Sequence, residues 1–410
     1  FFSQFSSFCL IAVVSGSLSV LDFGAKCDGL SLDTDAFVAA VRAGGVSGAT
    51  VTVPVGKSCV TGPFNLTSNV WLHVPQGSLV LASDDPALWP VIPPLPSYGA
   101  GRDHTGAGRR VAFIGAYHQS NVSIFGQGTI DGNGKWWWDH HHSGKEKYTR
   151  GHLVEFYNST DLSIRGVTLQ NSPFWTVHPV YSRRVNVDNI RILAPHDSPN
   201  TDGLDPDSSS DVTFTNSFVS NGDDCVAIKS GWDCFGYSFN MPSQNILVKN
   251  LTCTGSSGAA AIALGSEMSG GIRNVTVLDS LFFDLAGNGV NIKSSKYRGG
   301  YVRDVLIKNV TIHGAKKSVL RIADDYGSTN KACGPNPKVK LPVIKNIRFE
   351  DITGYSPLSA AVELAGLTGA PIQDVAFQNV HLNASAWRCS VVQNISATGV
   401  SPPAPSNCVG

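Results

Sequence analysis

A short pattern of apolar and polar positions returns along most of the chain. Each copy begins with an Asn, Asp or basic residue and continues as apolar-x-apolar, two spacer residues and apolar-x-apolar. The nine copies start 23 to 42 residues apart, at Asn121, Asp161, Arg184, Asp211, Asn245, Asn274, Asp304, Asn346 and Asp374. Apolar-x-apolar is the period of a strand with one buried face, and the spacers are typical of a turn into a second short strand. Copies at this spacing indicate a solenoid rather than a series of separate domains.

We interpret each copy as one coil of a right-handed parallel β-helix, which makes the fold class all-β. A β-sandwich or a β-propeller would also alternate apolar and polar positions. Those folds predict more even spacing and more hairpin dipeptides between the strands. The pattern therefore favours the β-helix.

The first coil of a solenoid exposes an apolar end unless another element covers it. The stretch LDTDAFVAAV predicts a short amphipathic helix at this place. We expect Asp33 to be its N-cap and Phe37, Val38 and Val41 to lie on its buried side. The helix would then cover the first coil.

The chain outside the repeats divides into three further segments. Residues 1–19 are interpreted as the remnant of a secretion signal, because their apolar run is too short to span a bilayer and is followed by small residues. An ordinary first strand is the alternative. We expect one β-helix domain over residues 20–400, with a long irregular loop from Trp89, and an extended Pro-rich tail over residues 401–410.

Sequons and cysteines indicate export, and we expect the protein to be secreted to the extracellular space or the cell wall. The eight Asn-x-Ser/Thr sequons begin at Asn65, Asn121, Asn158, Asn250, Asn274, Asn309, Asn383 and Asn394. Beyond the signal the number of cysteines is even, and no CxxC pair suggests zinc, so disulfides are the better interpretation. A Cys225–Cys253 bridge would brace an acidic loop and a Cys389–Cys408 bridge would close the tail, although spacing alone leaves the connectivity open.

The overall charge excludes some partners. Lys and Arg total 31, and so do Asp and Glu, so no net field favours nucleic acid or, for the mature protein, a membrane. We expect a monomer. Only 15% of the residues are charged, and yet one short loop contains Asp202, Asp205 and Asp207 and the next contains Asp223 and Asp224. Any charge-based function is therefore local.

Position within the repeat places these acids together. Asp202 and Asp223 each follow a strand pair, so we expect them at equivalent points of successive coils, roughly 4.8 Å apart. By the same alignment Lys293 lies above the acids, and Trp175 and His178 lie below them. The sequence thus predicts a groove that suits a linear polymer.

Clustered carboxylates without basic neighbours repel one another, so at least one should keep its proton through a raised pKa. That proton makes a general acid, and a second carboxylate can activate water. A separation of roughly 6.5 to 9.5 Å between the two indicates inverting glycoside hydrolysis. Two alternatives stay open: Asp205 and Asp207 in particular suit turn residues at strand ends, and the acids together could bind Ca²⁺ as in a lyase.

Two motifs, NTDG at Asn200 and GDDCVAIKSG at Gly222, resemble those of glycoside hydrolase family 28, the polygalacturonases. The resemblance implies a right-handed parallel β-helix that hydrolyses the galacturonic acid polymer of pectin with inversion. It assigns Asp223 as the general acid, and Asp202 and Asp224 as the pair that activates water. It implies no metal and no organic cofactor.

The chain departs from the family pattern at two positions. Ala259 stands where the family has a histidine, and the family's Arg-Ile-Lys is here Asn291-Ile292-Lys293. Arg would bind a uronate carboxylate through two hydrogen bonds, which Asn cannot reproduce. Three outcomes stay open: weaker polygalacturonase activity, action on a related pectic backbone such as rhamnogalacturonan, or an inactive pectin-binding wall protein. The residues predicted to bind substrate are Lys293, Asn291, His178, Lys229 and Asn200.

Overall fold

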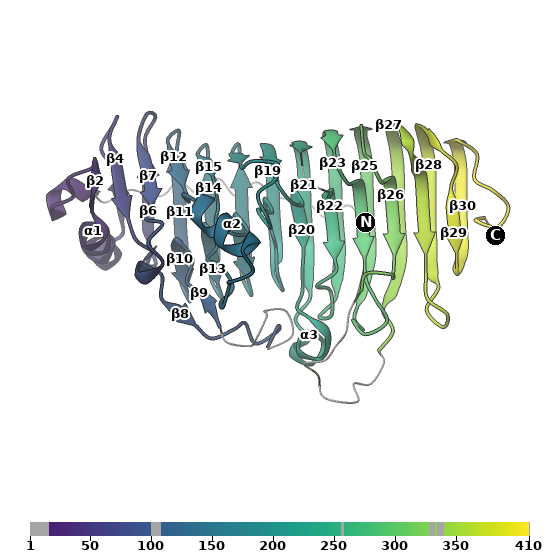
Figure 1. Ribbon diagram of the computed structural model, residues 1–410, viewed down its shortest axis with the longest axis horizontal. Coiled ribbons are helices and arrows are strands. Elements are labelled where there is room, and N and C mark those ends of the chain that lie inside the picture. The colour runs from purple at the N-terminus through teal and green to yellow at the C-terminus, as the bar shows by residue number, and fades with distance from the viewer. Residues whose placement is uncertain (1–15, 100–107, 256–257, 328–332, 334–339, 410) are drawn as a thin grey trace.

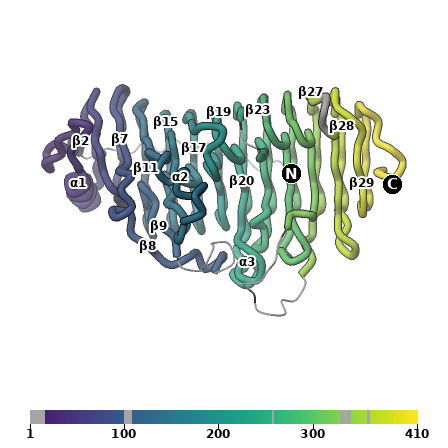
Figure 2. Tube along the Cα trace, in the orientation of Figure 1, coloured from purple at the N-terminus to yellow at the C-terminus, as the bar shows by residue number. Residues whose placement is uncertain are grey.

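The computed structural model describes residues 16–99, 108–255, 258–327, 333 and 340–409. The coils stack along one axis from the N-terminal to the C-terminal end of the chain (Figures 1 and 2). Strands of successive coils pair in parallel, and their order along the stack follows the sequence. The protein is a right-handed parallel β-helix, which confirms the predicted fold class.

Each coil contributes to three faces, and we call the one that carries the acidic loops the acid face. The acid face contains β5 (Phe64–Asn65), β10 (Ile114–Tyr117), β13 (Val154–Tyr157), β16 (Val177–Val180), β20 (Val226–Ile228), β22 (Ala260–Gly265), β24 (Asn288–Lys293), β26 (Ser318–Ala323) and β29 (Arg388–Ser390). The second face begins with β1 (Ser17–Ser19), β3 (Ala49–Thr52), β6 (Val70–Val74), β11 (Ser120–Gly126), β14 (Thr160–Arg165) and β17 (Arg183–Asp188). The third begins with β2 (Asp28–Leu32), β4 (Ser58–Thr61), β7 (Leu79–Ala82), β12 (Thr129–Asp131), β15 (Thr168–Gln170) and β18 (Arg191–Leu193).

In later coils one long strand bends across the second and third faces, and β27 continues onto the acid face, where it pairs with β26 and β29. These strands are β19 (Ser210–Asn221), β21 (Ser243–Gly255), β23 (Ile272–Leu285), β25 (Tyr301–His313), β27 (Val343–Ala365), β28 (Ile372–Ser385) and β30 (Val392–Ser401). The helices are α1 (Thr34–Ser47), α2 (Lys135–His142) and α3 (Asp233–Phe239), and β8 (Val91–Ile92) pairs antiparallel with β9 (Arg109–Arg110). Two 3₁₀ turns cover Val20–Phe23 and Pro86–Leu88.

The first, polar position of each repeat is a turn in the left-handed backbone region. Asn121, Asn274 and Asp304 have φ angles of 57°, 53° and 58°. Among non-glycine residues Asn and Asp tolerate this region best, because their short side chains can bond locally. These side chains also join successive coils; the Asn274 amide, for example, donates to the Asn245 side chain at 2.8 Å.

This turn also explains most of the sequons. Six of the eight sequon asparagines have a positive φ, namely Asn121, Asn158, Asn250, Asn274, Asn309 and Asn394. A turn asparagine, a buried apolar residue and an outward Ser or Thr produce Asn-x-Ser/Thr without any need for a glycan. The sequon count therefore carries less weight for export than the sequence suggested.

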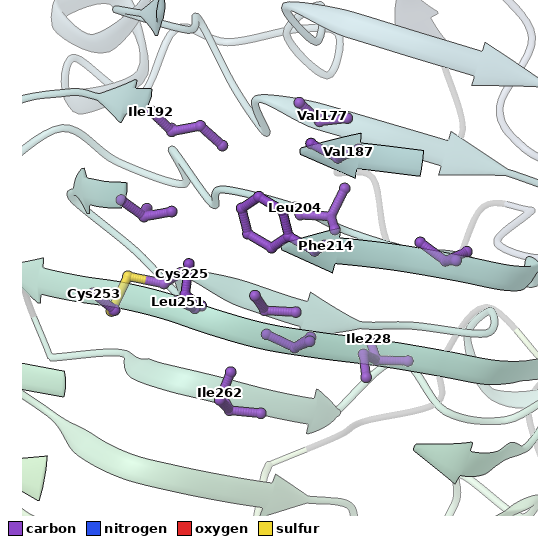
Figure 3. Close-up of a cluster of buried hydrophobic side chains, with 14 of the residues drawn as sticks. Val177, Val187, Ile192, Leu204, Phe214, Cys225, Ile228, Leu251, Cys253 and Ile262 are labelled. Atoms are coloured by element: carbon purple, nitrogen blue, oxygen red, sulfur yellow. A yellow bond between two sulfur atoms is a disulfide. The ribbon is translucent and has the colours of Figure 1, made fainter. Parts of the chain in front are cut away.

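Alternate side chains of every strand enter one continuous core. Figure 3 shows part of this core, where Val177, Leu204 and Phe214 pack together. Matching residues of adjacent coils stack directly: the Phe349 and Phe377 rings pair in register, with centroids 5.1 Å apart and planes at 9°. The apolar-x-apolar pattern thus corresponds to buried ladders that run along the stack.

Helix α1 covers the first coil as predicted, but one buried position of the prediction is wrong. Phe37 is fully buried and Val41 is 2% exposed, whereas Val38 is 47% exposed and faces solvent. Asp33 is the N-cap residue as predicted, but its side chain makes no cap hydrogen bond. Its carboxylate instead accepts from the Lys26 and Cys27 amides, so it fixes the chain before the helix.

The predicted signal segment lies mostly outside the described residues, which begin at residue 16. Ser17–Ser19, which the prediction included in the signal, forms strand β1 and pairs with β3. No helix among the described residues has the length and apolar content needed to cross a membrane.

Four disulfides link neighbouring segments. Both predicted bridges, Cys225–Cys253 and Cys389–Cys408, are present. Cys27–Cys59 joins the first coils, and Cys234–Cys333 ties α3 to a distant loop. The predicted pairing of all eight cysteines beyond the signal is therefore confirmed.

The irregular segment from Trp89 lies over the N-terminal half of the acid face. The Tyr98 hydroxyl donates to Asp207 at 2.6 Å, and Arg109 forms an ion pair of the same length with Glu155. Through these contacts the described part of the segment covers the carboxylates of Asp207 and Glu155, which are both fully buried.

The turn position gives a test of the fold. Asn309 has a φ of 54°, and its amide donates to Asp279 in the preceding coil at 2.8 Å. Asn309→Ala should reduce the free energy of unfolding by about 1 to 3 kcal/mol, because alanine is strained in this region and the hydrogen bond is lost. Asn309→Gly should lose less, since glycine adopts this φ freely. Chemical denaturation measures the free energy of unfolding of both variants. Equal losses would show that the left-handed backbone conformation at position 309 does not cause the destabilisation.

Candidate active site

The stacking register brings the two acidic loops together, one residue away from the predicted alignment. Leu204 and Val226 form a parallel bridge, and the Gly203 amide donates to the Asp224 carbonyl at 3.0 Å. Asp202 is therefore level with Asp224, and the expected equivalence of Asp202 and Asp223 is wrong. Of the double aspartate, Asp224 is level with Asp202, and Asp223 directly precedes Asp224 in the chain.

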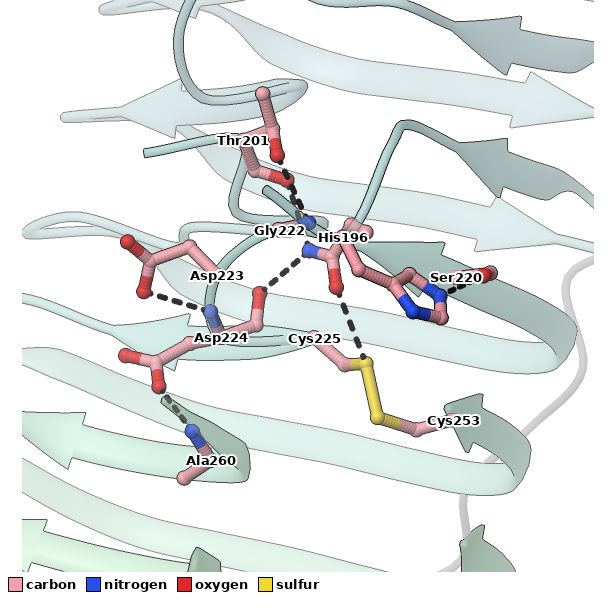
Figure 4. The surroundings of a disulfide bond; sticks show 10 residues. His196, Thr201, Ser220, Gly222, Asp223, Asp224, Cys225, Cys253 and Ala260 are labelled. Atoms are coloured by element: carbon pink, nitrogen blue, oxygen red, sulfur yellow. Dashed lines mark hydrogen bonds between the residues drawn. A yellow bond between two sulfur atoms is a disulfide. The ribbon is translucent and has the colours of Figure 1, made fainter. Parts of the chain in front are cut away.

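The backbone of the Asp223 loop is tightly held (Figure 4). The Asn221 amide donates to the Thr201 and Asp224 carbonyls at 2.8 and 3.1 Å, and the Thr201 hydroxyl accepts from the Gly222 amide at 3.0 Å. A Cβ on Gly222 would lie 2.0 Å from a backbone oxygen of the loop before Asp202, so only glycine fits. These contacts fix the two acidic loops relative to each other.

Asp223 and Asp224 differ in how their carboxylates are bonded. Asp224 is 2% exposed, and both of its oxygens are bonded, Oδ1 to the Ala260 amide at 2.6 Å and Oδ2 to Lys293 Nζ at 2.8 Å. Asp223 accepts the Asp224 amide through Oδ1 at 2.8 Å, and its side chain lines the pocket described below. Asp224 is thus a fixed anion, whereas Asp223 keeps an oxygen for another partner.

The expectation that the acids have no basic neighbours is wrong. Lys293 bonds Asp224, and Lys229 Nζ lies 3.4 Å from Asp202 and 3.3 Å from Asp205. Lys229 also lies 3.7 Å from Glu267 and over the Trp175 ring at 4.2 Å. Two lysines, one on each side of the cluster, thus offset part of its negative charge.

Even with these lysines, the environment keeps a proton on the cluster. Burial, then the charges of Asp202 and Asp224, raise the pKa of Asp223 to about 8, against a smaller opposite effect of Lys293. Burial also raises the pKa of Asp202 and of Asp205. The predicted raised pKa thus arises chiefly from burial, and Asp223 is protonated at neutral pH.

The acids lie as close together as the stacking of coils predicts, which is closer than the separation expected of an inverting pair. One oxygen from each of Asp202, Asp223 and Asp224 can be chosen so that all three lie within 4.8 Å of one another. This is shorter than the roughly 6.5 to 9.5 Å on which the inverting prediction relied, so separation does not indicate the stereochemistry. The same oxygens could ligate a divalent cation, but Lys229 and Lys293 already bring positive charge to them.

A pocket of about 750 Å³ opens from Asp223 toward the C-terminal coils. Of the predicted substrate-binding residues, Lys293 and Asn291 line it, and so does Ala259, at the place of the family histidine. The remaining lining residues are Gly258, Asn288, Lys317, Ser318, Arg321, Asp325, Tyr326, Gly327, Glu363 and Arg388.

Three predicted substrate-binding residues have other surroundings. His178 is fully buried between Glu155 and Asp207, at 3.1 and 3.3 Å, so the prediction that it faces the groove is wrong. Lys229 is 3% exposed and contacts Asp202 and Asp205 instead of lining the pocket. The Asn200 side chain accepts from Arg150 at 2.7 Å, which fixes the loop before Asp202.

Sequence reasoning missed the cations of the C-terminal coils. Arg321, Lys317 and Arg388 line the same pocket as Asp223 but lie far from it in the sequence. The repeat register could have located Arg321, because β24 pairs with β26 and Asn291 is level with Arg321. Arg388 follows the last copies of the pattern and gave no such signal.

Comparison with known proteins agrees with this geometry. Residues 101–401 match the model of glycosyl hydrolases family 28. A probable polygalacturonase of Vitis vinifera is 43% identical over 94% of this chain and 79% of that protein. An endo-polygalacturonase of Pectobacterium carotovorum subsp. carotovorum is 32% identical, over 83% of this chain and 82% of that protein. The crystal structure of a hyperthermoactive exopolygalacturonase from Thermotoga maritima covers 94% of this chain and 91% of its own, with a TM-score of 0.82 and 25% identity.

The raised pKa of Asp223 predicts a pH-dependent effect on stability. A carboxyl whose pKa is raised in the folded state stabilises that state below its unfolded pKa, near 3.8, and this contribution is lost as the pH rises toward about 8. Asp223→Asn cannot ionise. Its melting temperature should therefore match the parent near pH 4 and exceed it increasingly up to about pH 8. Thermal unfolding at several pH values tests this, and a constant difference would show that Asp223 is not a protonated buried acid.

Proposed function

Because the chain belongs to glycosyl hydrolase family 28, we propose that it hydrolyses the α-1,4-galacturonosyl linkages of pectin with Asp223 as the general acid. The observation that carries the proposal is the place of the Asp223 carboxyl, whose pKa burial raises, in a pocket also lined by Lys293, Lys317, Arg321 and Arg388. A polyuronate supplies the negative charge that such a pocket attracts, and its glycosidic oxygen needs the proton.

The proton transfer follows from the bonding of the acids. Asp223 gives its proton to the leaving glycosidic oxygen and becomes an anion beside Lys293, whose charge offsets the new negative charge. In the proposed step, Asp202 or Asp224 accepts a proton from the water that attacks the sugar. Lys229 stabilises the Asp202 anion from behind.

We propose that the hydrolysis proceeds with inversion. A retaining mechanism needs a carboxylate that bonds to the sugar carbon. Both oxygens of Asp224 are already bonded, and Asp202 is 3% exposed with Lys229 beside it, which suits a role in orienting water. The resemblance to the family implies the same outcome.

The proposed location is the extracellular space or the cell wall, with pectic polysaccharide as the partner of a monomeric protein. Four disulfides support an oxidising compartment, because such bridges are rare in reducing ones. A wall protein that binds pectin without cleaving it is the second candidate, motivated only by the Ala259 and Asn291 departures. The complete set of acids argues against it.

Asp223→Asn should reduce the turnover of de-esterified polygalacturonan by orders of magnitude, since no group would protonate the leaving oxygen. Binding of oligogalacturonides should persist. Reducing-sugar release and a binding assay measure the two effects, and undiminished cleavage by the variant would exclude Asp223 as the acid. If the parent binds polygalacturonan and releases no reducing ends, the wall-binding candidate is favoured.

A second measurement tests the stereochemistry. Inversion at an α-linkage predicts that the first product carries a β-configured reducing end, which slowly equilibrates with the α-form. NMR recorded within minutes of adding enzyme to oligogalacturonide distinguishes the two. An α-configured first product would contradict inversion and would require one of the acids to act as a nucleophile.

A further inference from the structure

The family arginine is absent at Asn291, but an arginine stands directly beside this position in the next coil. Asn291 in β24 is level with Arg321 in β26. Strands paired in this way lie roughly 4.8 Å apart, and both residues line the pocket that contains Asp223. A guanidinium is therefore present at the site, displaced by one coil away from the acids.

Arg321 is held in a fixed orientation with part of its guanidinium uncommitted. Nη2 donates to Asp325 at 2.6 Å, and Nε lies 3.2 Å from Glu363. Nη1 forms no hydrogen bond with another residue of the described chain. The Arg321 side chain is 15% exposed, whereas that of Asp325 is 58% exposed. The two carboxylates thus orient the guanidinium while leaving donors for a further anion.

Asn291 adds a second feature that points to a ligand. The residue is 8% exposed, and its side-chain oxygen has no hydrogen-bond partner within the described chain. Buried acceptors are rarely left unpaired, because desolvation costs about 1 to 3 kcal/mol. Asn291 lines the pocket, and a small turn of its side chain would bring this buried oxygen to a donor such as a sugar hydroxyl.

The charges around Arg321 complete the site. Lys317 and Arg388 line the same part of the pocket, and the Lys317 ammonium donates to the Gly258 carbonyl at 2.9 Å. Of the four cations in the pocket, Lys293 is paired with Asp224, and the other three exceed the carboxylates of Asp325 and Glu363 by one charge. An anionic sugar unit therefore balances charge in this pocket better than a neutral one.

We propose that Arg321 binds the carboxylate of a galacturonate unit one coil further from the acids than the family arginine would, while Asn291 accepts a hydroxyl of the same chain. The inference rests on the proposed function and assigns Arg321 as the residue that makes the site selective for uronate over neutral or esterified sugar. The arginine lost at Asn291 is thus replaced in space.

The test measures binding separately from catalysis. In the Asp223→Asn background, titration calorimetry compares de-esterified with fully methyl-esterified oligogalacturonide. Adding Arg321→Gln should weaken binding of the de-esterified ligand by about tenfold to a hundredfold, the usual size of a charged hydrogen bond, and leave the esterified ligand nearly unaffected. Arg321→Lys, which keeps the charge but not the fork, should fall between. Arg184→Gln, which breaks an exposed ion pair with Asp161 on the second face, is the control and should change neither affinity.

A double variant that exchanges the two residues distinguishes a direct contact with the ligand from a structural role of Arg321. Asn291→Arg combined with Arg321→Asn returns the guanidinium to the family position and should recover most of the lost affinity, whereas a merely structural Arg321 would leave the swap as weak as Arg321→Gln. Melting temperatures show whether each variant is folded. Equal loss on both ligands, or no loss on either, would overturn the proposal. If the parent cleaves polygalacturonan while Arg321→Gln binds it normally, the proposed function stands and only this assignment fails; a parent that neither binds nor cleaves rejects the function itself.

Discussion

The structure depends on the parallel hydrogen bonding that keeps each coil in register with the one before it. This register fixes which side chains become neighbours, because residues level with each other are separated only by the spacing between strands. It stacks Phe349 on Phe377 in the core and places Asp202 beside Asp224 on the acid face. The same spacing that gives close packing inside the stack forces like charges together outside it, so packing and catalysis share one constraint.

The acid face offsets that repulsion by alternating charge along the stack. Lys229 lies behind Asp202 and Asp205, and Lys293 lies beside Asp224. Their charges do not remove the burial cost, and the pKa of Asp223 stays raised to about 8. The cluster therefore contains both a fixed anion and a protonated acid at neutral pH. General acid–base chemistry needs an anion and a protonated acid together, and burial provides the second. The same burial lowers the stability of the folded state as the pH rises.

The solenoid also allows a functional group to move between coils. Successive strands present their outward side chains in one row. The guanidinium of Arg321 therefore reaches the part of the pocket next to the part that an arginine at position 291 would reach. Asp325 and Glu363 orient this guanidinium. Moving the arginine from position 291 to position 321 therefore also involves these two carboxylates. A motif compared along the sequence alone would record only the loss at Asn291.

The sequence by itself determined the repeat, the fold class and which acids we propose to be catalytic, since apolar alternation, turn asparagines and the two motifs are all local features. It also indicated two of the disulfides and the proximity of Lys293. The tertiary structure alone decided the offset that aligns Asp202 with Asp224, the burial of His178 and Lys229, and the place of Arg321. Alternation shows that a side chain leaves the strand outward, but a distant segment, such as the one carrying Tyr98 and Arg109, decides whether it then meets solvent. Such contacts join residues far apart in the chain, and no local period encodes them.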